Sequence, residues 1–164
     1  MRTLFNTLVI VSMAVLLAGC AAPSFSDGMT NAARQTAVKT AVDARQYSFK
    51  AMTAATQKGR NINLTSAYGI VVKPDMLSCD LPFFGTSFGG SAYGGEGAIR
   101  FESKQFEYSA EPGKKNGWTV TIVPKDKPEV QKIMMMIGAE GYTTVTVIST
   151  NRSAMNYYGN LEWK

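Results

Sequence analysis

Two cysteines and twelve carboxylates are the first candidates for nucleophilic or acid–base chemistry in this sequence, and histidine is absent. A nucleophilic cysteine needs a neighbouring base or a positive field to ionise. Asp80 directly follows Cys79 and disfavours its thiolate. Serine hydrolysis of the Ser-His-Asp type lacks its histidine base. We therefore expect Cys79 to be an inert, buried or half-buried thiol, and we assign no catalytic residue.

The run Met134-Met135-Met136, together with Met76 and Cys79, has the soft ligands that some metal ions prefer. Consecutive residues on a strand point to opposite faces, so the three methionines of the run cannot all face one ion. Packing in a core or an interface explains them better. We predict no metal site and no cofactor.

Paired carboxylates for glycoside cleavage are the remaining catalytic alternative. The candidates are Asp75, Asp80, Glu96, Glu102 and Glu107, which are scattered through the sequence. Their separation in space decides whether any two can cooperate, and the sequence does not determine it. A carboxylate-dependent enzyme is therefore kept as an alternative function.

The segment between Asp75 and Phe101 is rich in glycine and aromatic residues. It lacks the lysine that ends a P-loop, and no second strand–helix unit follows as in dinucleotide-binding folds. Base stacking would also need a basic groove, and the net charge of the chain is only +5. The segment is either a tightly turning connector whose aromatic side chains cover the core, or a ligand-contacting loop. No nucleic-acid partner is expected.

If the segment contacts a ligand, its aromatic side chains are the candidates. They form the predicted ligand-binding set together with two aromatic residues later in the chain: Phe83, Phe84, Phe88, Tyr93, Trp118 and Tyr158.

Residues 1–19 resemble a bacterial lipoprotein signal peptide. Arg2 precedes an apolar run that ends at Leu17, and Leu17-Ala18-Gly19-Cys20 matches a lipobox. A membrane-spanning helix needs roughly 20 apolar residues, and this run is shorter and ends at a processing-type site. We expect Cys20 to carry lipid chains such as palmitate, which anchor the protein without spanning the membrane.

Residues 20–29 then form a tether. Position 21 is Ala21 and not the aspartate that retains lipoproteins at the inner membrane, so the resemblance favours the outer membrane. Whether the anchored domain lies on the periplasmic face of this membrane or on the cell surface is left open.

The rest of the chain, residues 30–164, is expected to be a single β-rich domain with an N-terminal helix. The helix is predicted over Thr30–Arg45, capped by Thr30 or Asp27. Short alternating runs predict strands, and residues 129–137 fit a helix or a buried strand. The fold class is mainly β (α+β), with one antiparallel barrel or sandwich. The predicted strand runs lie near residues 47–51, 68–72, 98–102, 105–108, 118–122, 142–149 and 154–158.

The sequence contains a series of short motifs in its second half and centre: Asp75, Leu81-Pro82-Phe83-Phe84-Gly85, Ile99, Phe101, Gly117-Trp118, Gly141-Tyr142, Asn151-Arg152 and Tyr158-Gly159-Asn160-Leu161. Through these motifs the sequence from Thr36 to Leu161 resembles a family of Bacteroidetes lipoproteins, the domain-of-unknown-function family 4251. The resemblance implies a secreted, lipid-anchored, mainly β domain in which residues 129–137 form a strand. It implies no catalytic residues.

Together these features predict an outer-membrane lipoprotein that is not an enzyme and binds a small molecule, a glycan or a protein partner in the envelope. The alternatives are the carboxylate-dependent enzyme and a subunit of an envelope assembly.

Overall fold

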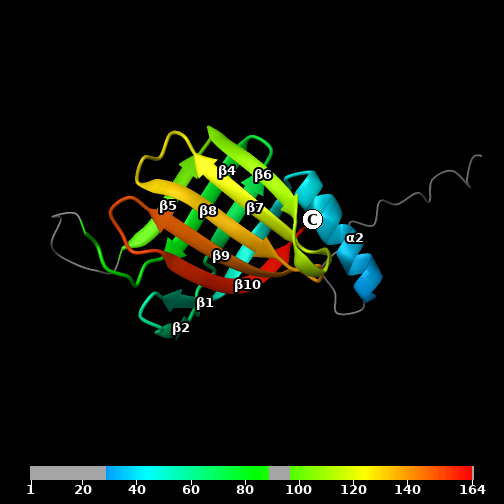
Figure 1. Cartoon of the computed structure of the whole chain (residues 1–164), viewed down its shortest axis with the longest axis horizontal. Helices are drawn as coiled ribbons and strands as arrows, with labels where there is room; N and C mark the ends of the chain where they lie inside the picture. Colours follow the sequence, from blue (N-terminus) through cyan, green and yellow to red (C-terminus); the bar gives the residue numbers. More distant parts are fainter. Residues whose placement is uncertain (1–28, 89–96, 164) are drawn as a thin grey trace, which may run out of the picture.

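The structure, a computed structural model, describes residues 29–88 and 97–163. The predicted signal peptide, Cys20, Tyr93 and Glu96 lie outside these residues. These described residues form one helix followed by ten strands, with a short 3₁₀ turn at Lys114–Asn116 (Figure 1). The elements are α2 Asn31–Asp43, β1 Tyr47–Thr56, β2 Asn61–Asn63, β3 Gly69–Lys73, β4 Met76–Pro82, β5 Ala98–Ser103, β6 Phe106–Pro112, β7 Trp118–Pro124, β8 Val130–Ile137, β9 Tyr142–Ser149 and β10 Met155–Glu162.

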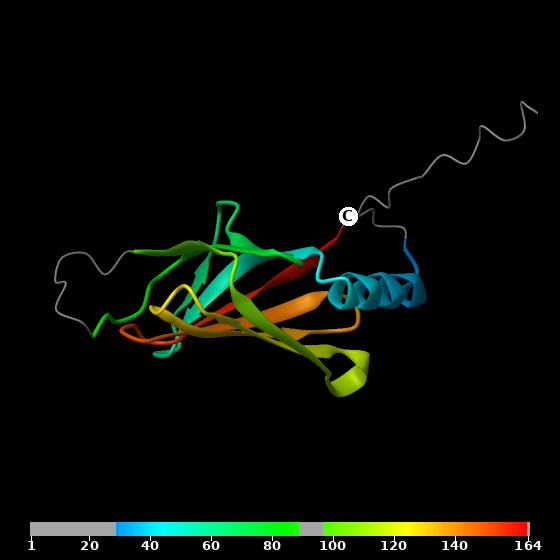
Figure 2. The same cartoon turned by 90° about the horizontal axis from the view of Figure 1, so that it is seen from above.

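All ten strands belong to one antiparallel sheet with the order β5-β4-β3-β1-β10-β9-β8-β7-β6, and β2 pairs with β1 beside this path. The sheet curls until its two edge strands, β5 and β6, face each other without pairing (Figure 2). The mainly β prediction is confirmed. Of the two architectures left open by the sequence, the single curved sheet is barrel-like and nearly closed.

The core follows from alternation along most of each strand, in which every second side chain points inward. In β8, Ile133 and Met135 are fully buried, whereas Met136 is 56% exposed. The methionine run therefore points to both faces of the sheet, as the strand geometry requires. Residues 129–137 thus contain a strand, as the family resemblance implied.

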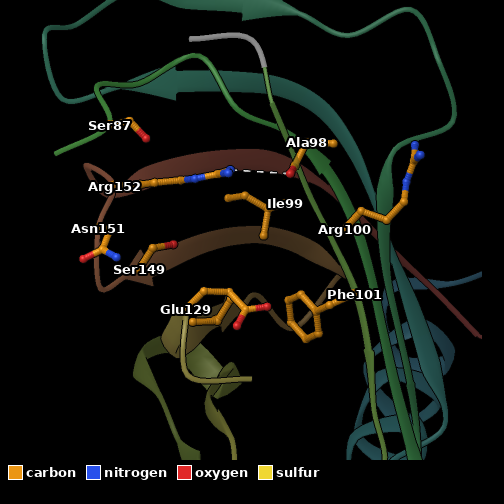
Figure 3. Close-up of a pocket in the computed structure, with 10 residues that line it drawn as sticks. Ser87, Ala98, Ile99, Arg100, Phe101, Glu129, Ser149, Asn151 and Arg152 are labelled. Carbon is orange, nitrogen blue, oxygen red and sulfur yellow. Dashed lines mark hydrogen bonds between the residues drawn. The ribbon is translucent and has the colours of Figure 1, made fainter. Parts of the chain in front are cut away.

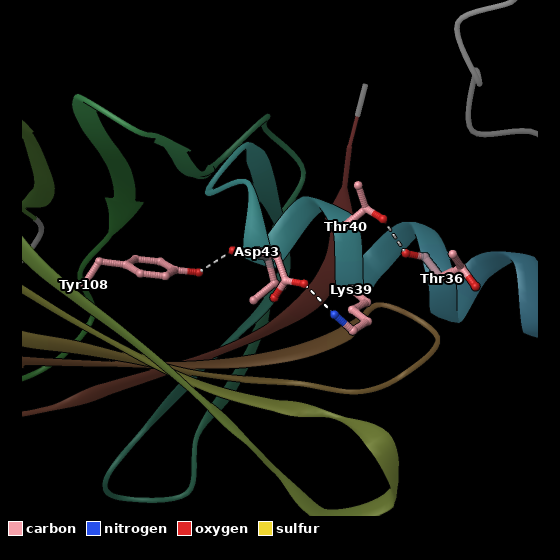
Figure 4. Close-up of polar contacts among 6 residues, drawn as sticks. Thr36, Lys39, Thr40, Asp43 and Tyr108 are labelled. Carbon is pink, nitrogen blue, oxygen red and sulfur yellow. Dashed lines mark hydrogen bonds and ion pairs between the residues drawn. The ribbon is translucent and has the colours of Figure 1, made fainter.

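Helix α2 covers one end of the barrel. The Thr30 side chain caps it by accepting a hydrogen bond from the Ala33 N–H, and Val38, Ala41 and Val42 are its buried residues. An exposed ion pair joins Lys39 to Asp43 at 2.6 Å (Figure 4). The helix lies against the domain through a few small side chains, which agrees with its thin apolar stripe.

Two tyrosines, the buried Tyr47 and the half-buried Tyr108, attach the helix to the sheet. The Tyr108 hydroxyl on β6 donates to the Val42 carbonyl at 3.2 Å (Figure 4) and lies 3.2 Å from the Tyr47 hydroxyl on β1. Burial raises the pKa of both hydroxyls, so both stay neutral. The Arg45 guanidinium lies 4.9 Å from the centre of the Tyr108 ring. Edge strand β6 is thereby held against β1 and the end of the helix.

Two strands were not predicted from the sequence. Strand β2 lies within a segment interpreted as a loop, and β4 lies at the start of the segment interpreted as a connector. In β4 the buried residues Leu77, Cys79 and Leu81 alternate with partly exposed ones. The period-2 signal was present, but the flanking proline and glycine residues obscured it. Within the described parts of the chain, no helix is long and apolar enough to cross a bilayer.

We predict that Tyr108→Phe lowers the free energy of unfolding by about 1–2 kcal/mol, because the Val42 carbonyl and the Tyr47 hydroxyl lose their shared partner in a partly buried site. Urea denaturation followed by circular dichroism measures the change. The matched control is Tyr142→Phe, since Tyr142 is 66% exposed and should change stability by less than about 0.5 kcal/mol. Equal effects of the two substitutions would contradict the structural role of the tyrosine pair.

Candidate functional site

The barrel opens at the end opposite the helix, in a cleft of about 320 Å³ between edge strand β5 and the segments that begin β8 and follow β9 (Figure 3). Its apolar lining consists of Ala98, Ile99, Phe101 and Val130. Its polar lining consists of Ser87, Arg100, Glu129, Ser149, Asn151 and Arg152.

The cleft exists because β5 has a strand on one side only. The Phe83 N–H donates to the Gly97 carbonyl at 2.9 Å, and hydrogen-bonded pairs alternate along an antiparallel ladder. Ile99 and Phe101, which oppose Leu81 and Cys79, therefore bond to β4. The main-chain groups of the intervening residues point away from β4, toward the unpaired side of β5. These residues are Ala98, Arg100 and Glu102.

Arg152 is held at the cleft by a short pairing of two loops. Ser87 forms an isolated bridge with Arg152, and the Ser153 N–H donates to the Thr86 carbonyl at 2.8 Å. The guanidinium lies 5.1 Å from the centre of the Phe83 ring, a cation–π arrangement that fixes its plane. Its single hydrogen bond to residues 29–88 and 97–163 is a long one, 3.5 Å from Nη1 to the Ala98 carbonyl. Most of its five donors therefore make no hydrogen bond to the described residues.

Glu129 also lines the cleft. It lies next to Phe101, and Ile99 and Ser149 separate it from Arg152 (Figure 3). Its main chain is fixed by the Thr150 N–H, which donates to the Glu129 carbonyl at 3.0 Å. Its carboxylate makes no ion pair within the described part of the chain. The cleft thus has a cationic side chain on one side and an anionic one on the other.

Arg100 contributes its main chain to the cleft. Its side chain turns away (Figure 3) and pairs with Asp80 at 3.0 Å on the outer surface. The lining therefore contains one inward-facing cation, Arg152, and one carboxylate, Glu129.

Part of the ligand-binding set predicted from the sequence borders this cleft. Phe83 is buried beneath Arg152, and Phe84 is half-buried against the core. Phe88 is 70% exposed, and its N–H donates to the Asn151 carbonyl at 2.8 Å. Tyr93 lies outside the described residues. The predicted loop therefore supports the cleft through Phe83, although the lining residue from this loop is Ser87.

The other two predicted residues lie elsewhere. Trp118 begins β7 near the helix, where the Lys39 ammonium is 5.8 Å from its ring centre. Tyr158 faces outward on β10, opposite Thr144 of β9 and Thr53 of β1. The structure does not bring either residue to the loop that begins at Phe83.

Ser87 has the spacing of a hydrolase nucleophile, since Gly85-Thr86-Ser87-Phe88-Gly89 fits Gly-x-Ser-x-Gly. In hydrolases this motif forms a turn between a strand and a helix, with a histidine as base. Here Ser87 forms a bridge with Arg152, and the chain has no histidine. The spacing alone does not make Ser87 a nucleophile.

The remaining chemical candidates do not line the cleft. Cys79 is 1% exposed; burial raises the pKa of its thiol and the charge of Asp80 raises it further. Asp80 pairs with Arg100, and Glu107 pairs with Lys125 at 2.8 Å. Among the residues that the structure describes, no group of three His, Cys, Asp or Glu side chains is placed to hold a metal ion.

The two charged cleft residues were not recognised from the sequence. Asn151-Arg152 was interpreted as a turn, and Glu129 as the start of an ambiguous segment. One signal was available: Asn151-Arg152 is among the motifs on which the family resemblance rests, and a turn alone does not require arginine.

The fold is therefore a small antiparallel β-barrel. A helix covers one end of this barrel, and a polar cleft lies at the other end. The family described as "Domain of unknown function (DUF4251)" matches residues 30–161, and the chain belongs to this family. The crystal structure of a DUF4251 family protein from Bacteroides eggerthii has a similar fold, with a TM-score of 0.62 and 16% sequence identity over 82% of this chain and 92% of that chain. Curated proteins gave no match.

We predict that Cys79 does not react with thiol reagents in the folded protein. In a Cys20→Ser variant Cys79 is the only thiol, so its labelling by iodoacetamide at pH 8 can be followed by mass spectrometry. Because the raised pKa keeps the native thiol protonated, labelling should be at least about 100-fold slower than in urea. Equal rates in buffer and in urea would show that Cys79 is accessible and ionisable.

Proposed function

We propose that this protein is an outer-membrane lipoprotein, anchored through Cys20, that binds a small molecule, a glycan or a protein partner without transforming it. The observation that carries the binding role is the open cleft with the Arg152 guanidinium, whose single hydrogen bond to the described residues is a long one. A preformed concave site with a few convergent polar groups is typical of ligand recognition.

The position of the cleft supports this role for an anchored protein. Helix α2, which begins after Thr30, lies at one end of the barrel, and the connection between β9 and β10 lies at the other (Figure 1). That connection carries Asn151 and Arg152 of the cleft. A lipid on Cys20 would therefore attach the domain from its helix end. The cleft would face away from the membrane and toward ligands in the surrounding compartment.

The composition of the cleft favours binding over glycoside cleavage. Paired-carboxylate mechanisms need two carboxyl groups, on the order of 5–10 Å apart. Among the described lining residues, Glu129 is the only carboxylate. The candidates Asp80, Glu102 and Glu107 are on β4, β5 and β6, and two of them are in surface ion pairs.

The outer face of the sheet supports a second candidate, a subunit of an envelope assembly. One row of outward residues crosses five strands without a charge: Thr119, Met136, Thr144, Tyr158 and Thr53. Met136 and Tyr158 are 56% and 44% exposed. Exposed apolar side chains in such a row are typical of an interface.

The anchoring is tested by metabolic labelling with a clickable palmitate analogue in cells that produce the full chain. We expect the wild type to be labelled and the Cys20→Ala variant to be unlabelled, because acylation requires the thiol. Arg152→Ala, which leaves Cys20 intact, is the control and should be labelled like the wild type. An unlabelled wild type would refute the lipid anchor.

The binding role is tested by native mass spectrometry of the mature lipoprotein, purified in mild detergent from its own cells. We expect a reproducible extra mass on the monomer that Arg152→Ala removes, because the variant loses the principal donor of the cleft. Arg60→Ala, in the exposed turn after β1, is the matched control. An extra mass that persists in Arg152→Ala would place the ligand elsewhere, and a bare oligomer would favour the assembly role.

A further inference from the structure

We propose that the cleft binds a short peptide with free termini in an extended conformation, which pairs with β5 and is oriented by Arg152 and Glu129. This inference rests on the proposed binding function and adds to it the chemical class and orientation of the ligand.

The first argument is the unpaired edge of β5. Ala98, Arg100 and Glu102 direct their main-chain N–H and C=O groups toward the cleft side, where no strand lies. An exposed edge with free donors and acceptors is the recognition element of β-strand addition. A sugar or a lipid head group has no regular ladder with which to match these alternating groups, whereas an extended peptide has one.

The second argument is the comparison with the other edge strand. Strand β6 ends in Pro112, which has no N–H, and its Tyr108 is held by Tyr47 and Val42. Proline at a sheet edge blocks strand addition. Strand β5 contains no proline, and a cleft lies along it. Of the two strands that end the sheet order, β5 is therefore the one whose free edge can pair with an added strand.

The third argument is Arg152 at the Ala98 end of β5. Guanidinium groups bind carboxylates through two parallel hydrogen bonds, and stacking on Phe83 orients the group for this contact. The existing contact to the Ala98 carbonyl is long, 3.5 Å, so a ligand can replace it at small cost. An N–H of the bound peptide would then donate to the Ala98 carbonyl, and the C-terminal carboxylate of the peptide would bind the Arg152 guanidinium.

The fourth argument is Glu129 near Phe101, at the other end of the same edge (Figure 3). Ala98 and Phe101 are three residues apart, which corresponds to about 10 Å along a strand. An opposite charge at each end matches a zwitterion of three or four residues and disfavours a ligand with only negative charge. With its carboxylate at Ala98 and its ammonium at Phe101, the peptide would run antiparallel to β5.

The test uses the mature lipoprotein in detergent micelles and the tetrapeptide Val-Ala-Val-Ala with free termini. Isothermal titration calorimetry should show saturable binding. Hydrogen exchange measured by mass spectrometry should slow in the fragment containing 98–103, because bound peptide pairs with amides that are unpaired in the free protein.

Chemical variants of the probe assign the two ends. Amidation of the peptide C-terminus and Arg152→Ala should each weaken binding by about tenfold or more, and the two changes together should cost little more than either alone. Glu129→Gln should weaken binding of the free-amine peptide and leave the N-acetylated peptide unchanged. Arg60→Ala is the matched control and should bind like the wild type.

Three outcomes would overturn the inference, and they are distinct from failure of the proposed function. Binding of acetate or phosphate as tight as the peptide would show a simple anion site. Protection at 98–103 by a chitin tetrasaccharide and not by the peptide would show a glycan site. Absence of peptide binding, while the native protein still carries an Arg152-dependent extra mass, would leave the binding function intact and refute the peptide.

Discussion

The structure depends on the incomplete closure of one curved sheet. A closed barrel removes its edges by pairing the first strand with the last. Here β5 and β6 face each other without pairing, so the free main-chain groups of each edge strand must be protected in another way. On β6, Tyr108 attaches the strand to β1 and the end of α2. At the end of β5, the buried Ser103 hydroxyl donates to Asp126, which follows β7. The start of β5 pairs with β4 on one side, and the cleft lies on its other side.

The two ends of the barrel consequently differ in their chemistry. The helix end contains neutral, buried hydroxyls and small apolar side chains, which resist water and change little with pH. The cleft end contains Arg152 and Glu129, which are unpaired with each other and partly in solvent. This polarity fits the proposed lipoprotein, in which the end that joins the tether would be stable and the end proposed to bind a ligand would be accessible.

Stability in this fold comes from packing. Among the described residues the only cysteine is Cys79, whose thiol is buried and free, so no disulfide contributes there. Tyr157 illustrates the alternative: its ring is fully buried, and its hydroxyl donates to the Pro82 carbonyl at 2.8 Å. That contact joins the end of β4 to the centre of β10 across the barrel. It also holds in place the strand end from which Phe83 supports Arg152, so core packing and the cleft are coupled.

The sequence by itself determined the local features. Alternation in residues such as Tyr47, Phe49 and Ala51 indicated which side chains enter the core, and Thr30 marked the helix start, because both signals lie within a few neighbouring residues. Only the tertiary structure decided that the sheet curls into a barrel, that β4 fills part of the glycine-rich segment, and that Trp118 and Tyr158 lie far from Phe83. It also placed Arg152 and Glu129 in one cleft with Ala98. Ala98, Glu129 and Arg152 are 23 to 54 positions apart in the sequence. Their positions around one cleft depend on how the whole sheet twists, which no local pattern encodes.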